Sequence, residues 1–499
     1  MLWLAVAAIL YTASFPKVGF HWAAFFCFIP LFLLTKGNKT SQNFRLFFIF
    51  SFFSYLLILY WIPSVLVKYG GTTVFLGVTA LLVLSTFLSL FSGLAGIFIG
   101  KALTQKPFAL ILVPLIWVSR DLIIEKIFSG FPWCSAGYSQ FEHIFFIQWA
   151  EWGGIHLITF FLIYFNVLLY KLIQEKKLKY FISFLASFLL VESLGIGLYS
   201  LNQSRMEQIA VHQAGIIQPN ITHDRTFDFD SCNRELKGLF ELSETLKQKG
   251  AEFVVWPEYT LPIYPMQTPF YLDQFISFSN HKIPLLAGFT DYENQQNVFN
   301  AIFLFAGDRI DQYNKVHLTP FGEYVLFRKW LFFVKKITDE IGDFTPGRDE
   351  RPLLFRGHRL ATPICYEIIY PELVKNFIAQ GGELIITISN DSWFGHSSAP
   401  YQHLSMAVFR SIENRRYMLR STSNGISALI APSGKIVHQA KMSTKEAYLA
   451  RFRFLTRKTI FTRVGFIFPY LCAFLFSVCF VPDLIRAIKH RRQSPHSSR

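Results

Sequence analysis

The stretch Leu360-Ala361-Thr362-Pro363-Ile364-Cys365-Tyr366-Glu367 decides how the rest of the chain is interpreted. An apolar run leads into one cysteine, and a tyrosine and a carboxylate follow it directly. Pro371 suits a first helical turn, where its missing N–H costs nothing, and Gly381-Gly382 is a good stop signal. The spacing therefore predicts a strand, a tight turn at Cys365 and a helix.

The position of Cys365 allows two interpretations. A cysteine at a strand-to-helix turn lies near the N–H groups of the helix start, which favour a thiolate, so Cys365 is a candidate nucleophile. Free cysteine is also among the most buried residue types and commonly acts as a small hydrophobic side chain. This stretch alone leaves both interpretations open.

The composition is that of a membrane protein. Of 499 residues, 52% are hydrophobic and only 16% are charged, well below the ~25% of ordinary globular chains. The apolar excess is concentrated in the first 200 residues and in a short C-terminal piece. The net charge of +15 resides largely in short loops and at the C-terminus, which suits membrane orientation and argues against nucleic-acid binding. Six cysteines without paired spacing indicate neither a disulfide scaffold nor a metal site, and we expect no cofactor.

About eight apolar segments are candidates for membrane helices, since a bilayer core needs ~20 helical residues. We interpret the first as a membrane segment rather than a signal peptide, because it has no basic n-region and no cleavage site. The segments are 2–16, 18–35, 46–66, 73–100, 107–128, 143–170, 180–200 and 464–482.

Basic residues follow the second, fourth, sixth and eighth segments, whereas the alternate loops carry few charges or a balanced set. The positive-inside rule then predicts that both termini are cytoplasmic and that the large polar region lies on the opposite face. The expected division is a membrane bundle at 1–200, a catalytic domain at 201–460, and a last helix with a basic tail at 461–499. The basic residues are Lys36, Lys39, Arg45, Lys101, Lys106, Lys171, Lys176, Lys177, Lys179, Arg486, Lys489, Arg491 and Arg492; the balanced set is Arg120, Asp121, Glu125 and Lys126.

In the region 201–460, short apolar runs alternate with polar helical stretches, which predicts an α/β domain with a mixed sheet. The expected strands are 211–218, 253–256, 283–289, 298–305, 359–364, 384–389 and 426–431, and the expected helices include 234–249 and 401–420.

Three residues that can do chemistry follow strands or turns of this region: Glu258, Lys315 and Cys365. Ligands and catalytic groups gather at strand ends of an α/β sheet. A thiol is mostly protonated at neutral pH, so a carboxylate would have to take its proton, and a lysine could neutralise the oxyanion of an acyl intermediate. Taken singly, the glutamate could be a loop charge and the lysine a solvated turn residue. A Cys–His pairing with His317, His396 or His403 is an alternative, although none has a diagnostic context.

Three separated blocks resemble the nitrilase superfamily, in the order Glu, Lys, Cys. They are Trp256-Pro257-Glu258, Lys315 to Tyr324, and Ile364 to Glu367. Together with Asn390-Asp391-Ser392-Trp393-Phe394-Gly395, they look like its membrane branch, the apolipoprotein N-acyltransferases of the bacterial inner membrane. The resemblance covers essentially the whole chain. It implies a multi-helix membrane bundle plus a periplasmic nitrilase-like domain, an α-β-β-α sandwich.

The resemblance also implies a ping-pong acyl transfer. Cys365 would attack a phospholipid acyl ester to form a thioester, and the α-amino group of a diacylglyceryl-cysteine on a lipoprotein would accept the acyl chain. Glu258 would be the base and Lys315 the oxyanion partner. We expect Glu323, Tyr366, Glu367 and Trp393 to support the site, with Glu323 orienting Lys315 and Glu367 contacting Lys315 or the amine. We expect a monomer whose partners are a phospholipid donor, diacylglyceryl lipoproteins and membrane lipids.

Some positions depart from the family pattern: Val325-Leu326, Ser423-Asn424 and Ala431. Two apolar, aromatic stretches next to the motifs, Tyr259–Met266 and Val325–Val334, could be mobile loops over an acyl-chain pocket or could simply pack on the core. Two other functions remain as alternatives. One is a membrane-anchored amidase or nitrilase that hydrolyses a C–N bond, and the other is a transporter or scaffold with an inactive domain.

Overall fold

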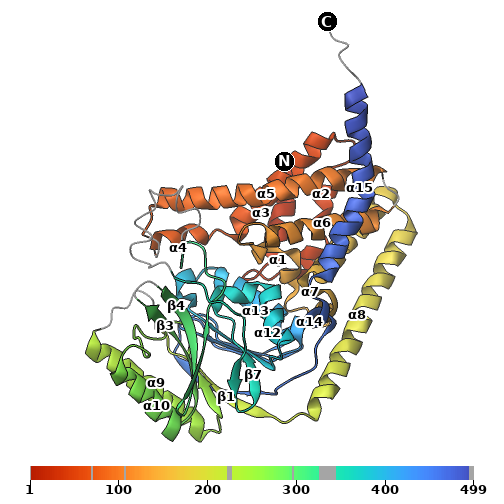
Figure 1. Cartoon of the computed structure of the whole chain (residues 1–499). Coiled ribbons are helices and arrows are strands. Elements are labelled where there is room, and N and C mark those ends of the chain that lie inside the picture. Colours follow the sequence, from red (N-terminus) through yellow and green to blue (C-terminus); the bar gives the residue numbers. More distant parts are fainter. Residues whose placement is uncertain are drawn as a thin grey trace.

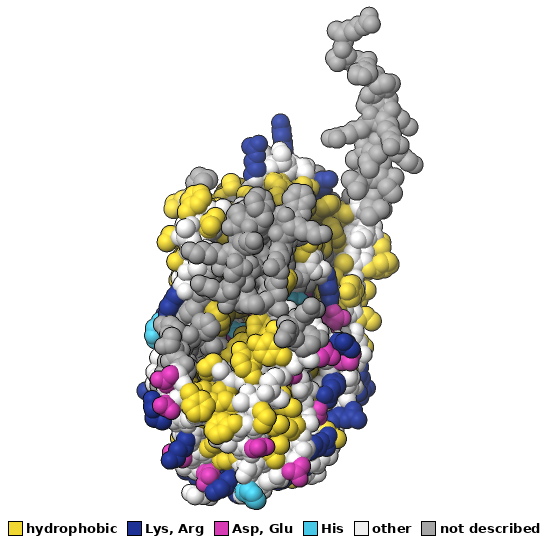
Figure 2. Space-filling model, turned by 60° about the vertical axis from the view of Figure 1, so that its left-hand side comes forward, with side chains coloured by type: hydrophobic (Ala, Val, Ile, Leu, Met, Phe, Trp, Pro, Cys, Tyr) yellow, Lys and Arg dark blue, Asp and Glu magenta, His cyan; other side chains and the backbone are white. Residues whose placement is uncertain are grey.

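A bundle of apolar helices and a domain of sheets covered by helices form the two halves of the molecule (Figure 1). The computed structural model describes residues 2–68, 71–105, 108–221, 228–294, 297–324 and 344–493. Apolar helices form a bundle at one end, two β-sheets lie at the other, and α15 extends away from the sheets. Figure 2 shows hydrophobic side chains over the bundle and most charged side chains over the sheet-containing half.

The bundle is built from the apolar segments predicted from the sequence. Among the described residues, four helices are long and apolar enough to span a membrane, at 40–58, 74–104, 146–175 and 178–207, and three apolar helices are shorter. The count of eight spans is therefore not confirmed. The bundle helices are α1 (Leu2–Ser14), α2 (Ile29–Leu33), α3 (Thr40–Ile58), α4 (Ile62–Lys68), α5 (Val74–Gln105), α6 (Ala109–Lys126), α7 (Ala150–Glu175), α8 (Leu178–Glu207) and α15 (Ile467–Gln493).

Two predictions about the bundle are wrong. The segment expected at 46–66 is two helices, α3 and α4, because Pro63 cannot donate the N–H that would continue α3. The charges Arg120, Asp121 and Glu125 lie inside α6 and are buried, not in an exposed loop. They are paired within the bundle, which makes their burial tolerable.

The predicted α/β domain is confirmed, with two six-stranded mixed sheets that face each other. The first has the order β12-β1-β2-β3-β4-β5 and the second β11-β10-β9-β8-β7-β6. The strands are β1 (His212–Gln218), β2 (Phe253–Val255), β3 (Leu285–Asn294), β4 (Asn297–Ala306), β5 (Arg309–Asn314), β6 (Leu353–Phe355), β7 (His358–Ala361), β8 (Leu384–Ser389), β9 (Met418–Thr422), β10 (Ala428–Ile430), β11 (Ile436–Gln439) and β12 (Glu446–Phe452).

Helices cover the outer face of each sheet, as expected for an α-β-β-α sandwich. Helices α9 (Phe229–Gln248) and α10 (Pro269–His281) pack on the first sheet. Helices α12 (Pro371–Ala379) and α13 (Ala399–Asn414) lie between the second sheet and the bundle (Figure 1). The central strands β1–β2–β3 and β7–β8–β9 are parallel. Parallel strands are buried on both faces, which explains why β8 is a continuous apolar run with every residue buried.

The helix predicted at 401–420 is too long. Helix α13 ends at Asn414, where Arg415 has a left-handed backbone with φ +50°. Met418–Thr422 then forms β9, hydrogen-bonded between β8 and β10. Pairing with two neighbouring strands overrides the helical pattern of the sequence here.

Helix α13 connects the sheet domain to the bundle through buried polar contacts. Gln402 Oε1 accepts the indole N–H groups of Trp61 at 3.2 Å and Trp133 at 2.7 Å. Glu413 accepts the main-chain N–H of Ile155 at 3.0 Å, just after a kink in α7. Arg415 donates to Glu151 at 2.5 Å. Each contact joins a residue of the sheet domain to a residue of the bundle. Together these contacts fix the position of the sheet domain relative to the bundle.

Gln402→Leu is expected to lower the free energy of unfolding by about 1–3 kcal/mol, because it leaves two buried indole N–H groups without their acceptor. Thermal unfolding in detergent, followed by circular dichroism, measures the change. Gln274→Leu, on α10 away from the bundle, is the matched control and should behave as the wild type. Equal midpoints for both variants would contradict this role of Gln402.

Candidate active site

Glu258, Lys315 and Cys365 meet at the ends of three strands. Glu258 follows β2, Lys315 follows β5 and Cys365 follows β7. Lys315 Nζ lies 3.5 Å from Glu258 Oε1, and Cys365 lines the same cavity as both of these residues. The structure therefore brings together the three residues that the sequence singled out.

The turn at Cys365 presents its side chain through an unusual backbone. Cys365 has φ +50°, in the left-handed region that non-glycine residues rarely adopt. It begins a 3₁₀ helix, Cys365–Ile369, and α12 follows at Pro371 as the sequence predicts. An isolated bridge between Ile364 and Ile388 holds the turn beside β8. Local strain of this kind persists only where the surrounding structure fixes it.

Glu258 is buried and held at both oxygens. Its Oε1 accepts from Asn300 Nδ2 at 2.7 Å, and its Oε2 accepts from the main-chain N–H of Asn390 at 2.8 Å. Gly288 on β3 permits the close approach, because a Cβ there would lie 2.7 Å from the Glu258 Cα. Burial raises the pKa of Glu258 even though the Lys315 charge opposes the shift. A carboxylate with a raised pKa is suited to accept a proton from a thiol.

Lys315 is held by a second carboxylate, Glu323. The Lys315 Nζ lies 2.9 Å from Glu323, which also accepts the Thr319 N–H at 2.7 Å and Asn300 Nδ2 at 2.6 Å. Burial would lower the pKa of Lys315, but the charges of Glu323 and Glu258 outweigh it and raise that pKa. The same lysine lowers the pKa of Glu323 against the effect of burial. Lys315 is thus a buried positive charge that lines the cavity together with Cys365, and Glu323 contacts its ammonium group directly.

The expectation that the helix start favours a thiolate is wrong. Burial, followed by the negative charge of Glu258, raises the pKa of the Cys365 thiol. The helix here is a 3₁₀ segment of 5 residues, too short to offer much compensating dipole. Cys365 therefore rests as a thiol, and its reactivity depends on a base that removes the proton.

Glu367 stabilises the turn and does not contact the Lys315 ammonium group. Its Oε1 accepts from the Tyr313 hydroxyl at 2.8 Å and from the main-chain N–H groups of Val316 at 2.7 Å and His317 at 3.0 Å, and its Oε2 accepts from the Ile364 N–H at 2.7 Å. Burial raises the pKa of Glu367 to about 7. These bonds tie the lysine loop to the cysteine turn.

The site opens into a cavity of about 650 Å³. Tyr366 and Trp393 form part of its wall, as expected. The bundle contributes Val65, Leu66 and Trp133, and residues 259–264 of the loop after Glu258 also line it. Leu261 and Ile263 are buried in the core as well, so this loop both lines the cavity and packs on the core, and its mobility stays a prediction. The other loop, Val325–Val334, lies outside the described residues. The cavity is within the usual size range of ligand sites and is lined mainly by apolar side chains.

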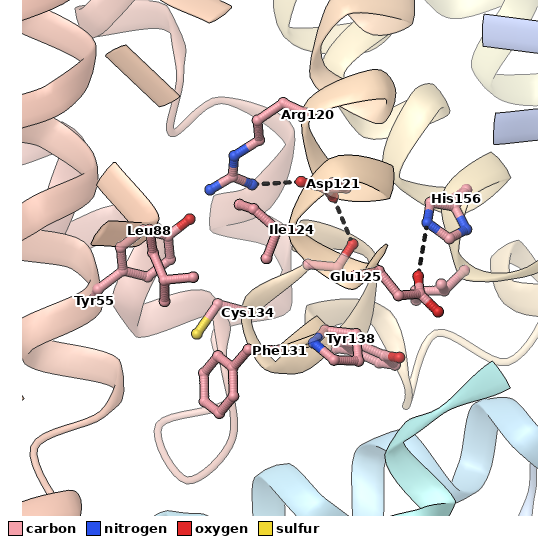
Figure 3. A pocket seen from close by; sticks show the side chains of 13 residues that line it. Tyr55, Leu88, Arg120, Asp121, Ile124, Glu125, Phe131, Cys134, Tyr138 and His156 are labelled. Atoms are coloured by element: carbon pink, nitrogen blue, oxygen red, sulfur yellow. Dashed lines mark hydrogen bonds and ion pairs between the residues drawn. The ribbon is translucent and has the colours of Figure 1, made fainter. Parts of the chain in front are cut away.

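A second cavity, inside the bundle, is too small for a substrate. Its volume is about 20 Å³, room for one water molecule. Figure 3 shows the ion pairs Arg120–Asp121 and Glu125–His156 beside it, the latter at 3.3 Å. Ser135 also donates to Asp121 at 2.9 Å. These contacts pair the polar groups within the bundle, except for His156 Nδ1, which is buried without a hydrogen-bond partner among the described residues.

Family models match both halves of the chain. The apolipoprotein N-acyltransferase N-terminal domain matches residues 7–168, and the carbon-nitrogen hydrolase domain matches residues 210–454. The apolipoprotein N-acyltransferase of Geobacter metallireducens is 31% identical over 99% of this chain and 96% of its own length. The chain belongs to the apolipoprotein N-acyltransferase family. This makes it an acyltransferase of lipoprotein biosynthesis, with a nitrilase-like domain that contains Glu258, Lys315 and Cys365.

Two further similar proteins are another apolipoprotein N-acyltransferase and a nitrilase-superfamily protein. The apolipoprotein N-acyltransferase of Aquifex aeolicus is 28% identical over 90% of this chain and 97% of its own length. A nitrilase-superfamily protein of Saccharomyces cerevisiae with a crystal structure covers 49% of this chain and 90% of its own, at 19% identity and a TM-score of 0.38.

Within the described residues, no hydrogen bond joins His317, His396 or His403 to the Cys365 sulfur, and His396 is exposed. His317 packs on Tyr370, with ring centroids 3.9 Å apart, and burial lowers the pKa of His317 to about 4. His403 Nε2 lies 3.1 Å from the main-chain carbonyl oxygen of Cys365, behind the nucleophile. Neither ring makes the contact with Sγ that a Cys–His mechanism would need.

Sequence reasoning missed several residues of the acyltransferase site. Asn300 bridges the two carboxylates, and Tyr259 donates to Glu323 at 3.3 Å. Asn300 interrupts the otherwise apolar run 298–306 of β4. A polar side chain within an apolar run is a signal that could have identified it. Ser423, one of the departures from the family pattern, donates to the main-chain carbonyl of Glu258 at 3.3 Å. This departure therefore contacts the backbone of Glu258 and also lines the cavity.

Proposed function

We propose that the chain transfers an acyl chain from a phospholipid, through a thioester on Cys365, to the α-amino group of a lipoprotein's N-terminal S-diacylglyceryl-cysteine. The observation that carries the proposal is the convergence of Cys365, Glu258 and Lys315 at the edge of a cavity that the bundle helps to line. A soluble amide substrate would not need a wall built from apolar bundle residues, whereas a lipid acyl chain needs an apolar wall of this kind.

In the first half-reaction, Glu258 takes the thiol proton as Cys365 Sγ attacks the ester carbonyl carbon. Lys315 neutralises the oxyanion of the tetrahedral intermediate, aided by its fixed position between Glu258 and Glu323. The intermediate collapses by breaking the bond to the glycerol oxygen. Glu258 returns its proton to that oxygen, and a lysophospholipid leaves.

In the second half-reaction, the amine of the diacylglyceryl-cysteine attacks the thioester carbonyl. Glu258 accepts a proton from the amine, Lys315 again faces the oxyanion, and the Cys365 thiolate leaves and is reprotonated by Glu258. An amide bond forms and the thioester bond breaks, so the enzyme returns to its resting thiol. Tyr366 and Trp393 serve as walls for the two lipid substrates.

Both substrates reach the site from the bilayer, which requires the catalytic domain at 201–460 to lie on the periplasmic face of the inner membrane. The bundle at 1–200 and the last helix with its tail at 461–499 carry basic residues toward the cytoplasm. Lys36, after α2, donates to Gln174 Oε1 near the end of α7 at 3.1 Å, and this contact supports the topology because it joins two chain segments that are both expected on the cytoplasmic side. Both termini are then cytoplasmic and the chain acts as a monomer.

Lys315→Met is expected to slow transfer by roughly 10²–10³-fold, the typical loss for one oxyanion-stabilising group. The rate of product formation at saturating phospholipid measures it. Lys282→Met, which removes an exposed lysine paired with Glu244, is the control and should retain the wild-type rate. A Lys315→Met rate within a few-fold of the wild type would remove Lys315 from the mechanism.

The acyltransferase and amidase alternatives are separated by supplying both kinds of substrate. The purified protein is incubated with phospholipid vesicles and a diacylglyceryl-cysteinyl peptide, and separately with small amides. Triacylated peptide together with lysophospholipid is the expected result. Release of ammonia from the amides, without acylation of the peptide, would overturn the proposal.

A further inference from the structure

Ser389 is the last residue of β8 and is completely buried directly behind the nucleophile. Its hydroxyl lies 3.2 Å from Cys365 Sγ and 2.7 Å from Asp391 Oδ1. A serine hydroxyl carries a single hydrogen, so it can donate to only one of these two acceptors at a time. The Oγ atom serves either acceptor without moving, because rotation of the O–H bond is enough.

The sulfur becomes an anion in both half-reactions, first as it attacks and then as it leaves. In the proposed mechanism Lys315 stabilises the carbonyl oxygen, and Glu258 accepts the thiol proton. Neither residue is then available to stabilise the sulfur anion. The surroundings disfavour a thiolate, since burial and the charges of Glu258 and Asp391 raise the pKa of the Cys365 thiol. Hydrogen bonds to a charged partner are stronger than neutral ones. A hydrogen-bond donor that already contacts Sγ therefore stabilises the ionised sulfur more than the neutral thiol.

A buried network fixes Ser389 and the cysteine turn together. Asp391 Oδ2 accepts from Arg420 Nη2 at 2.7 Å, and Arg420 Nη2 also lies 3.1 Å from His403 Nδ1. Burial and the Arg420 charge lower the pKa of His403. Its Nε2 lies 3.1 Å from the Cys365 carbonyl oxygen, and its Nδ1 lies 3.1 Å from Arg420 Nη2 and 3.3 Å from Asp391 Oδ1, so the ring joins the cysteine turn to the Asp391–Arg420 pair. The contact of His403 with the Cys365 carbonyl helps to hold the left-handed backbone of Cys365.

We propose that Ser389 is a further catalytic residue, which turns its hydroxyl from Asp391 to Cys365 Sγ when the sulfur is ionised, and that Asp391, His403 and Arg420 are its positioning residues. Proton balance is kept, because the thiol proton goes to Glu258 while the Ser389 hydrogen stays on its oxygen. The inference rests on the proposed function only for the assignment of Cys365 as nucleophile.

The test is the pH dependence of alkylation of Cys365 by iodoacetamide in the full-length protein without lipid, read by mass spectrometry of the peptide that contains Cys365. In Ser389→Ala the profile should move to higher pH, and the alkylation rate at neutral pH should fall on the order of 10- to 100-fold. The thermal unfolding midpoint in detergent should fall modestly, because Asp391 loses one buried donor, while the fold is retained. An unchanged profile and rate would overturn the inference.

The isosteric pair Ser389→Thr and Ser389→Val keeps the test valid if alanine disturbs the strand. The two side chains differ in one hydroxyl, so threonine should retain a profile near that of the wild type and valine should shift it upward. Equal profiles for the two would also contradict a role for the hydroxyl. The readout needs no lipid, so a failure of the transferase proposal would leave these shifts intact, whereas a failure of the Ser389 inference would leave acyl transfer intact.

Discussion

Cys365→Ala is expected to abolish acyl transfer, with residual product at least ~10⁴-fold below the wild type, because no other group can carry the acyl chain between donor and acceptor. Cys365 is the thiol that lies beside both Glu258 and Lys315. Formation of triacylated peptide from phospholipid and diacylglyceryl peptide measures the loss. Lysophospholipid release should disappear in parallel, since the first half-reaction already requires the sulfur.

A second cysteine provides the control for this variant. Cys232 is buried on α9, away from the cavity, so Cys232→Ala should retain wild-type transfer. Each variant removes one sulfur atom, from a half-buried position at Cys365 and a buried one at Cys232, and the two should unfold at similar temperatures. Substantial transfer by Cys365→Ala would show that the donor and acceptor react directly, and the thioester mechanism would have to be abandoned.

Glu258→Gln is expected to slow transfer by about 10²–10⁴-fold, the usual contribution of a general base. Glutamine keeps the shape but replaces one of the two acceptor oxygens with an NH2 donor, so it loses the hydrogen bond from either Asn300 or Asn390, and it cannot take the thiol proton. Burial raises the pKa of Glu258, and the base must be ionised to act. In the wild type kcat/KM should therefore fall as the pH decreases through this raised pKa, at a higher pH than for an exposed glutamate.

The pH profile distinguishes loss of the base from general damage. Glu258→Gln should lack the acidic limb that the wild type shows, whereas Glu244→Gln, which removes a carboxylate paired with Lys282 on the surface, should retain both limb and rate. A Glu258→Gln enzyme that is slow but keeps the wild-type acidic limb would assign that limb to another group.

Much of the architecture could be predicted because it depends on local patterns. Each predicted feature depends on residues that are consecutive in the sequence. These features are the apolar segments, the alternation of helices and strands, and the turn at Cys365 followed by Pro371. Glu258, Lys315 and Cys365 could be predicted to meet because each follows a strand or turn of the sheet domain, and strand ends converge. The strand at Leu384–Ser389 was predicted with its observed bounds for the same reason, since its six residues form an unbroken β-type run.

The remainder depends on contacts between distant residues. The left-handed Cys365, the raised pKa of its thiol and the bridge made by Asn300 come from neighbours that lie far away in the sequence. Strand β9 forms because β8 and β10 flank it, against the helical pattern of its residues. The charges of α6 looked like a loop because their partners, such as His156 on α7, cannot be inferred from spacing.

The polar contacts of α13 have a consequence for the mechanism. Trp133 lines the cavity and donates to Gln402, and His403, the next residue, contacts the carbonyl of the nucleophile. One helix therefore links the bundle to the back of the catalytic cysteine. The arrangement explains how a site that must receive its substrates from a membrane can keep a fixed geometry while it is attached to the bundle.

The central claim is that Cys365 carries the acyl chain, and its most direct test is the mass of the protein after incubation with phospholipid in the absence of any acceptor. The account predicts a mass increase of one acyl chain, located on the peptide that contains Cys365, removed by hydroxylamine as expected for a thioester, and absent in Cys365→Ala. An enzyme that remains unmodified under these conditions, or is modified at another residue, while it still acylates the diacylglyceryl peptide, would contradict the account.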